Sequence, residues 1–265
     1  MIKTYHEAPK AIFHQVQELT DGDYALVHMF EEDRQYYKLF QEALRKGRDN
    51  SVFERGEAFN ADTFAYWVYA LRPTWYIVPD VLEDADATIV RFFNFIEKYP
   101  DLPGKRIGVV QGKNYDDFVY CYKAIAPYCD KIGISFDCSW YVECAKGSTK
   151  WLQLAAGRLK TLLQMDEQRV IDRCKPHHLL GVAVPQELAC YAAFQRGGEF
   201  LWVDSVDTSN PVVHGLAGIS YGPSGLKDKE TRKLYTMINE QVSDEQWQVI
   251  RSNIQGFRRF CNGVE

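Results

Sequence analysis

The feature that most constrains the fold is a regular alternation of short β-rich runs with longer amphipathic segments. Strands separated by helices pair in parallel, because the chain must cross over the sheet before the next strand can begin. Eight such strands predict an α/β fold of the (β/α)8 TIM-barrel type, whose usual size is about 250 residues. The 265 residues therefore predict a single domain, 1–265, with a helical C-terminal segment. A doubly wound open sheet is the alternative, but no GxGxxG follows the first expected strand.

The expected elements follow the hydrophobic pattern and its punctuation by proline and capping residues. Asn60 or Asp62 can cap a helix at 61–71, and Pro73 ends it. We expect strands at 24–30, 48–54, 75–80, 106–112, 131–137, 178–184, 200–206 and 216–222. We expect helices at 33–46, 61–71, 83–98, 114–127, 150–173, 185–196 and 209–215, and one or two helices over 229–262.

Composition and charge narrow the class of protein. Hydrophobic residues make up 46% of the chain, which is enough for a sizeable core. The formal net charge is −5, which argues against broad adhesion to nucleic acid or anionic membranes. No apolar run approaches the ~20 residues of a membrane span, and MIKTYHEAPK lacks a signal-peptide core. Seven scattered cysteines without a CxxC pair fit reduced thiols. We therefore expect a cytoplasmic protein with no bound metal and no membrane partner.

Acidic and amide side chains fall where we take several expected strands to end. Asp49, Asp80 and Asp204 stand at three strand ends, and Gln111 stands at a fourth. Each has an ordinary explanation as a helix cap or turn residue. In a (β/α)8 barrel, however, the carboxyl ends of all strands meet at one mouth, where the active site forms. Their joint placement predicts a site of converging carboxylates.

Other chemistries lack their usual residues. No lysine ends an expected strand, which argues against a Schiff-base enzyme. The six histidines show neither HxH nor HExxH spacing, and the chain has no GxSxG elbow and no phosphate loop. Carboxylates without metal ligands suit chemistry at a glycosidic carbon, where one carboxylate attacks the anomeric carbon and a second moves protons.

The strand ends also resemble a known family. The segments DNSVFERGE (49–57), VPDVLED (78–84), GVVQG (108–112), IGIS (132–135), LLGVAVP (179–185) and WVDSVD (202–207) occur in the order seen in queuine/archaeosine tRNA-guanine transglycosylases. They are more similar still to the phage-type 7-deazaguanine DNA transglycosylases. The ordered set, rather than any single motif, carries this resemblance, which covers residues 49–210.

The resemblance implies a pentosyltransferase that exchanges guanine in DNA for a 7-deazaguanine derivative through a covalent aspartyl–nucleotide. It implies that Asp204 is the nucleophile and that Asp49 is the general base on the incoming base. Asp80 would accept from the N–H groups of guanine, and Gln111 would read its carbonyl oxygen. The resemblance also implies that Phe53 stacks on one face of the base and that Leu180 and Gly181 cover the other face. Gly133, Ile134 and Ser135 would run along the edge of the base, and Gly112 is a further implied substrate-binding residue.

Two departures from the family pattern favour DNA over tRNA as the substrate. The CxCxxC…H zinc module of the tRNA enzymes is absent, and the 61 residues after Asp204 are too few for a C-terminal RNA-binding domain. The family's VQGG reads VQGK here, which places Lys113 beside Gln111. An acidic protein must hold DNA through a local basic rim, for which Lys113, Arg55 and the run 227–233 are the candidates.

The expected partners are DNA, guanine and a free 7-deazaguanine base of the 7-cyano or 7-aminomethyl type, with no cofactor. The expected location is the host-cell cytoplasm if the protein is phage-encoded, and a homodimer is left open. Three alternatives stay open as well. They are the same exchange on tRNA, a nucleoside or glycoside hydrolase that uses the same carboxylates, and a non-catalytic barrel that binds nucleic acid.

Overall fold

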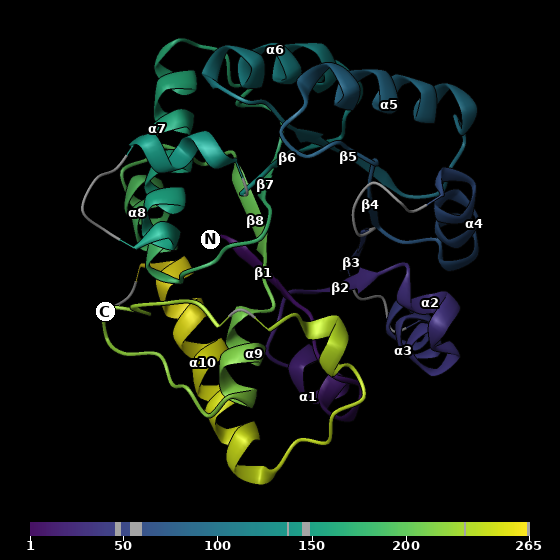
Figure 1. Cartoon of the computed structure of the whole chain (residues 1–265), viewed down its shortest axis with the longest axis vertical. Helices are drawn as coiled ribbons and strands as arrows, with labels where there is room; N and C mark the ends of the chain where they lie inside the picture. Colours follow the sequence, from purple (N-terminus) through teal and green to yellow (C-terminus); the bar gives the residue numbers. More distant parts are fainter. Residues whose placement is uncertain (46–48, 54–59, 137, 145–148, 231, 264–265) are drawn as a thin grey trace.

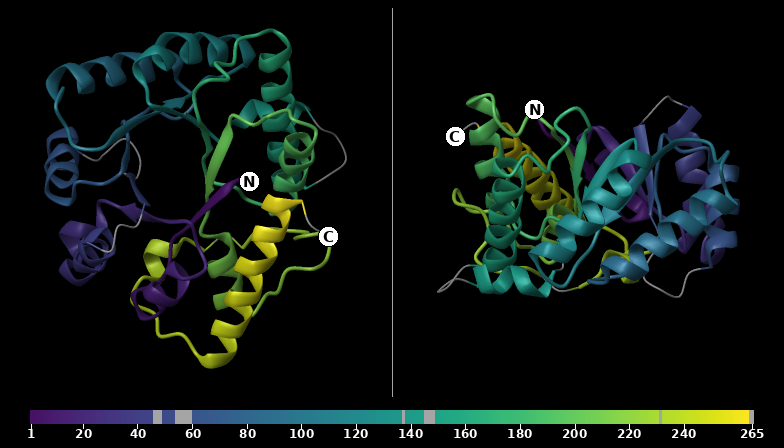
Figure 2. Two further views of the ribbon diagram at one scale, coloured as in Figure 1. Left: turned by 180° about the vertical axis from the view of Figure 1, so that it is seen from behind. Right: turned by 90° about the horizontal axis from the view of Figure 1, so that it is seen from above.

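The computed structural model describes residues 1–265 except 46–48, 54–59, 137, 145–148, 231 and 264–265, and it describes the backbone alone at 44–45, 49–53 and 144. Eight parallel strands close into one barrel, because β1 pairs with both β2 and β8. Helices surround this ring (Figures 1 and 2). The (β/α)8 prediction is confirmed. The strands are β1 (Lys3–His6), β2 (Gly22–Leu26), β3 (Asp49–Phe53), β4 (Trp75–Ile77), β5 (Lys105–Val110), β6 (Lys131–Ile134), β7 (His177–Leu179) and β8 (Val203–Asp207).

Two of the strand predictions are wrong. β1 lies in a stretch where no strand is predicted, because KTYH looks polar, yet it pairs along both edges and three of its four residues are buried. Residues 216–222, predicted as the last strand, form the end of α9 and a loop. The FLWVDSV run therefore holds the eighth strand, which begins at Val203 rather than at Phe200.

The helix predictions are largely confirmed. The Asn60 side chain caps α4 by accepting hydrogen bonds from the backbone N–H groups of Asp62 and Thr63. The segment 229–262 contains the short 3₁₀ helix η4 (Leu234–Met237) and one long helix. The α-helices are α1 (Phe13–Gln17), α2 (Met29–Glu32), α3 (Arg34–Arg45), α4 (Ala61–Leu71), α5 (Ala85–Lys98), α6 (Tyr115–Ile125), α7 (Lys150–Glu167), α8 (Gln186–Arg196), α9 (Asn210–Leu216) and α10 (Asp244–Asn262).

Apolar packing lies on both sides of the strand ring. A larger core fills the space between the strands and the surrounding helices. Inward-facing side chains form a smaller cluster inside the barrel, as is usual for this fold. That inner cluster consists of Tyr5, Tyr24, Ile77, Ile107 and Val109. The interior is therefore a packed core rather than a channel.

The C-terminal helix completes the outer wall next to α8 and α9 (Figure 2). α9 and α10 approach closely because Gly215 has no side chain, and a Cβ there would lie 2.3 Å from Cγ1 of Ile250. The chain between these two helices crosses to the carboxyl ends of the strands, where several of its residues line a cavity. This connection places a polar segment over the barrel mouth.

Candidate active site

A cavity of about 600 Å³ lies at the carboxyl-terminal ends of the strands. Its floor comes from residues at or just beyond the ends of β1, β2, β4, β5, β6, β7 and β8. One side comes from residues 229–230 and 232–235, which we call the mouth strap. This end of a (β/α)8 barrel is where the active sites of such enzymes form, so the cavity is the candidate active site.

Asp80 and Gln111, both predicted to read the base, lie together in this cavity. Gln111 Nε2 donates to Asp80 Oδ2 over 2.6 Å. The amide orientation is defined because Gln111 Oε1 accepts the backbone N–H of Glu83 at 3.1 Å. Burial raises the pKa of Asp80, against the opposing effect of the hydrogen bond from Gln111. The pair therefore combines acceptor and donor atoms at one place in the cavity.

Asp207 is the carboxylate that β8 presents to the mouth, and the sequence prediction does not include it. It is the last residue of the strand and lines the cavity. Asp207 Oδ1 accepts the backbone N–H of Gly181 at 3.1 Å and lies 3.0 Å from His178 Nε2. Gly181 has a φ of +60°, a conformation that favours glycine. Asp207 Oδ2 takes part in neither contact.

Asp204, the nucleophile implied by the resemblance, lies at the opposite end of the barrel. It is the second residue of β8 and stands about 10 Å from Asp207 along an extended strand. Asp204 Oδ2 lies 2.7 Å from Lys131 Nζ, and Oδ1 lies 3.7 Å from Lys3 Nζ. Although burial opposes the effect, these ammonium groups hold the pKa of Asp204 below its ordinary value.

The predicted placement of Asp204 at the mouth is therefore wrong. The prediction treats Phe200–Trp202 as the start of the strand, but these residues form the turn before it, where the Val203 N–H donates to the Phe200 carbonyl. The sequence WVDSVD holds two aspartates three residues apart. That repeat is the signal that could have identified Asp207. If the strand boundary is moved by three residues, Asp207 rather than Asp204 stands at the carboxyl end of the strand.

The residues predicted on β3 separate along that strand. Asp49 opens β3 in register with Gly22, the first residue of β2, so its backbone lies away from the mouth, and the predicted placement of Asp49 at the mouth is wrong. Phe53 closes β3 in register with Leu26, which lines the cavity. Arg55 lies outside the described residues.

Three further predicted base contacts line the cavity, namely Ser135, Leu180 and Gly181. Gly133 and Ile134 are the last two residues of β6, directly before Ser135. The Ile134 carbonyl accepts the Leu180 N–H at 3.0 Å. The ends of β6 and β7 are thus joined where both contribute to the wall of the cavity.

The loop after β5 carries the other two predicted residues. Gly112 packs against the start of α6, where a Cβ would lie 2.5 Å from the backbone nitrogen of Phe118. Lys113 follows it with an exposed side chain, whose Nζ lies 3.9 Å from a carboxylate oxygen of Asp84. Lys113 therefore stands at the rim of the mouth rather than inside the cavity.

Glu7 is a second cavity residue that the sequence prediction misses, since β1 is not predicted. It directly follows β1 and lines the same cavity as Asp207. Burial, and then repulsion from Asp207, raise the pKa of Glu7 to about 8, while Lys229 opposes the shift. Glu7 is therefore mostly protonated at neutral pH. A protonated carboxyl group beside a carboxylate that accepts N–H groups is the division of roles that acid–base chemistry requires.

The mouth strap adds positive charge to a cavity whose floor is acidic. Lys229, Arg232 and Lys233 all line the cavity. Lys229 Nζ lies 4.7 Å from the centroid of the Trp151 ring. Arg232 Nε lies 3.8 Å from a carboxylate oxygen of Glu230. This arrangement suits a ligand with hydrogen-bond donors at its inner end and anionic groups at its outer end.

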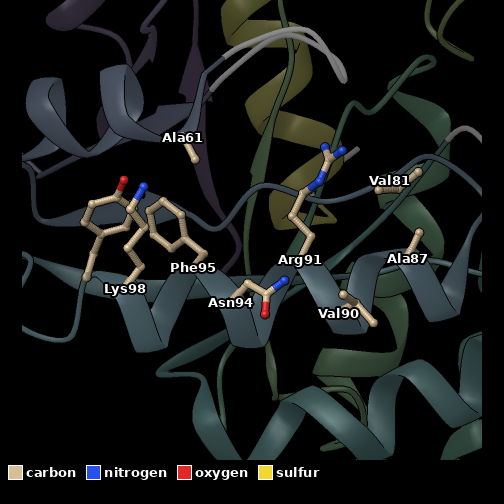
Figure 3. Close-up of a pocket in the computed structure, with 9 residues that line it drawn as sticks. Ala61, Val81, Ala87, Val90, Arg91, Asn94, Phe95 and Lys98 are labelled. Atoms are coloured by element: carbon tan, nitrogen blue, oxygen red, sulfur yellow. The ribbon is translucent and has the colours of Figure 1, made fainter.

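A second hollow, of about 380 Å³, lies beside α5 on the outside of the barrel (Figure 3). Figure 3 shows Val81 at one end, Lys98 at the other and Arg91 between them. Arg91 Nη1 donates to the backbone carbonyl of Asp80 at 3.0 Å. Arg91 therefore supports the loop that carries Asp80 into the main cavity.

The described part of the chain offers neither a cluster of metal ligands nor a membrane-spanning helix. Among the described residues, no group of three or more His, Cys, Asp or Glu side chains is placed to hold a metal ion. In the same part of the chain, no helix combines the length and the apolar character that crossing a membrane requires. The carboxyl groups that line the cavity are those of Glu7, Asp80, Asp207 and Glu230, and the His28 imidazole lines it as well.

Comparisons with known proteins bear on the fold. No protein-family model matches the chain, and no curated protein matches it. Among solved structures, 3-hexulose-6-phosphate synthase from Salmonella typhimurium matches with a TM-score of 0.52 and 9% identity, covering 98% of this chain and 100% of that chain. A likeness at this identity concerns the fold alone. The chain therefore shares the barrel fold of a TIM-barrel enzyme.

Proposed function

We propose that the protein is a base-exchange transglycosylase that replaces guanine in DNA with a 7-deazaguanine derivative, and that Asp207 rather than Asp204 is its nucleophile. The observation that carries this proposal is that Asp207, Glu7 and the Asp80–Gln111 pair line one cavity at the barrel mouth. The ordered motifs of the sequence support the type of reaction. The geometry supports the choice of carboxylate.

The Asp80–Gln111 pair matches the hydrogen-bonding edge of guanine. The ring N–H and the exocyclic amino group of guanine donate to Asp80, and its carbonyl oxygen accepts from Gln111 Nε2. Leu180 lines the cavity and offers an apolar surface to one face of the base. A 7-deazaguanine carries the same edge, because it differs from guanine in the other ring. One site therefore reads both the base that leaves and the base that enters.

The exchange needs one nucleophile and one group that moves a proton. Asp207 Oδ2 attacks the anomeric carbon, the bond from this carbon to N9 breaks with its electron pair on the base, and Glu7 gives its proton to the leaving guanine. The incoming base then loses its N9 proton to the Glu7 carboxylate, its N9 attacks the anomeric carbon, and Asp207 leaves. Glu7 ends protonated as it began, and its pKa of about 8 suits both roles.

The mouth strap suits the phosphates of the strand that carries the target nucleotide. A guanosine within a duplex must be extruded, or already unpaired, before it can reach Asp207. Its flanking phosphates then lie at the rim of the cavity, where Lys229, Arg232 and Lys233 supply cations. A local basic rim makes DNA compatible with a net charge of −5.

Incubation of the protein with DNA and with free 7-cyano- or 7-aminomethyl-7-deazaguanine tests this function. The DNA is then digested and its nucleosides are identified by mass. We expect incorporation of the 7-deazaguanine together with release of guanine. Incorporation into tRNA instead of DNA, release of guanine without incorporation, or DNA binding with no change of base would each contradict the proposal. These outcomes would favour the tRNA enzyme, the hydrolase and the binding barrel, respectively.

A further inference from the structure

A chain of buried polar groups runs through the barrel interior from its amino-terminal end to the mouth. Lys131 Nζ lies 3.1 Å from Ser205 Oγ, which lies 2.9 Å from His178 Nδ1. His178 Nε2 in turn lies 3.0 Å from Asp207 Oδ1. The exposed fractions of Lys131, Ser205 and His178 are 2%, 0% and 1%. None of these three residues has a role in the exchange mechanism described above.

Strand register brings these groups together. His178 and Ser205 are paired neighbours on β7 and β8, and Lys131 opens β6. The Tyr24 ring stacks on the His178 imidazole with centroids 6.4 Å apart and 7° between the planes, and the Tyr5 ring approaches it edge-on at 6.0 Å. The imidazole is thus enclosed by protein groups and depends on them for its hydrogen bonds.

The two ends of this chain define the direction of every hydrogen bond between them. An ammonium group only donates, so Ser205 Oγ accepts from Lys131. A carboxylate only accepts, so Asp207 Oδ1 accepts from His178 Nε2–H. Burial lowers the pKa of His178, against the effect of its bond to Asp207, so the ring is neutral at neutral pH. A neutral imidazole that carries its proton on Nε2 accepts at Nδ1, so the Ser205 hydroxyl donates to Nδ1.

We propose that Lys131, Ser205 and His178 form a donor relay that positions Asp207. The His178 Nε2–H and the Gly181 N–H together hold Oδ1, which leaves Oδ2 directed at the ligand. The other imidazole tautomer would place a nitrogen lone pair against Oδ1 and repel the carboxylate. His178 is a positioning residue, because it acts through Asp207. The catalytic importance of His178 rests on the proposed function of Asp207. The tautomer of its ring can be tested whether or not that function is correct.

The tautomer is tested on the wild-type protein by ¹⁵N NMR of the histidine side chains. The His178 signals are assigned by their loss in the His178→Gln variant. We expect a neutral ring protonated at Nε2, and we expect Ser205→Ala to increase the share protonated at Nδ1. A wild-type ring protonated at Nδ1, or on both nitrogens, would overturn the relay whether or not the protein exchanges bases.

Positioning is tested by the kinetics of base exchange in variants whose folding is confirmed by circular dichroism. His178→Phe removes the donor and should lower kcat by about 10- to 100-fold, with KM for the free base unchanged. A loss of this size is typical when the hydrogen-bond partner that orients a metal-binding side chain is removed. His178→Gln keeps an N–H donor near the place of Nε2 and should recover most of this loss. Equal losses in both variants, or a loss confined to KM, would contradict positioning. A wild-type protein without exchange would contradict the proposed function, while the NMR result would still decide the relay.

Discussion

The two ends of the barrel hold their carboxylates in opposite ways, although Asp204 and Asp207 lie on the same strand. At the amino-terminal end, Asp204 contacts the ammonium groups of Lys131 and Lys3. At the mouth, Asp207 is held by the Gly181 N–H and by the neutral His178 ring. A carboxylate paired with cations has its charge compensated within the fold. A carboxylate held by neutral donors keeps its charge available to a ligand.

The largest expected effect separates these two aspartates by activity. Asp207→Asn should fold and should lower the rate of base exchange by about 10⁴-fold, as expected when a covalent nucleophile is lost. Asp204→Asn is the matched control, because it makes the same chemical change on the same strand. It should retain exchange within about tenfold of wild type. Incorporation of a labelled base measures both rates, and the reverse ranking would return the nucleophile to Asp204.

A second prediction concerns recognition at the mouth. Asp80→Ala leaves the N–H donors of guanine without an acceptor, so discrimination of guanine against adenine should fall by about 2–4 kcal/mol. Asp80→Asn keeps one acceptor oxygen and should give an intermediate loss. Competition between the two bases for binding measures this discrimination. Unchanged selectivity in Asp80→Ala would assign base reading to another residue.

The free energy of unfolding should rank the two substitutions in the opposite order to activity, with the larger loss in Asp204→Asn. Asp204→Asn leaves the buried Lys131 ammonium beside a neutral amide, which should lower the free energy of unfolding by about 2–3 kcal/mol. Asp207→Asn replaces contacts to neutral donors and should cost about 1 kcal/mol. Urea denaturation with linear extrapolation gives both values. Equal losses would show that the two ends do not differ in the way we describe.

How much of this could be predicted from sequence depends on how sharply each strand is bounded. VPD directly follows β4 and VVQG spans the end of β5, so Asp80 and Gln111 are found at the correct place. Around β8 the pattern misleads, because Phe200 and Trp202 are buried by aromatic packing in the turn that precedes the strand. The same error, a boundary displaced by three residues, selects Asp204 in place of Asp207.

Two features of the site depend on pairing that a sequence pattern does not contain. Glu7 belongs to the mouth only because the short polar β1 closes the barrel between β2 and β8. The contact of His178 with Asp207 depends on the register of β7 against β8, which includes an irregularity between His177 and His178. Fold class follows from local periodicity, whereas the site follows from register between distant segments.

A fourth prediction uses the opposite pKa shifts at the two ends. Glu7 has a pKa of about 8 in the folded protein and an ordinary value of 4.5. Between these values the folded state binds more protons than the unfolded chain, so its free energy of unfolding falls as pH rises. Glu7→Gln removes this dependence. Its stability relative to wild type should be about 1–2 kcal/mol greater at high pH than at low pH, less than full linkage because Glu7 is partly exposed.

Asp204 should show the reverse dependence. Its pKa is lowered in the folded state, so the stability that it contributes is present above the unfolded pKa and is lost as pH falls through the folded pKa. The deficit of Asp204→Asn should therefore shrink in acid. Denaturation curves at several pH values measure both variants. Parallel pH profiles for Glu7→Gln and wild type would show that Glu7 does not take up a proton on folding.

The smallest expected effect compares two exposed lysines at the opposite ends. The Lys113 side chain is 69% exposed and lies 3.9 Å from Asp84, in the loop that also carries Gln111. An ion pair this exposed contributes little stability, so the ammonium group can exchange its carboxylate for a phosphate at little cost. A DNA strand that directs one base into the cavity brings the phosphates on either side of that nucleotide to this rim. Lys113 is therefore a phosphate contact only if the mouth is where DNA binds.

The measurement is the salt dependence of DNA binding. Lys113→Ala should reduce the slope of log K against log salt by about one and leave the affinity for free base unchanged. Lys3→Ala is the matched control, because Lys3 is 52% exposed but belongs to the amino-terminal end, where it contacts Asp204. A specific loss in Lys113→Ala would place the nucleic acid at the mouth, since counterions are released only where phosphates are contacted. Equal losses in the two variants would mean that DNA is attracted to the whole surface. That result would contradict the proposal that DNA binds at the barrel mouth.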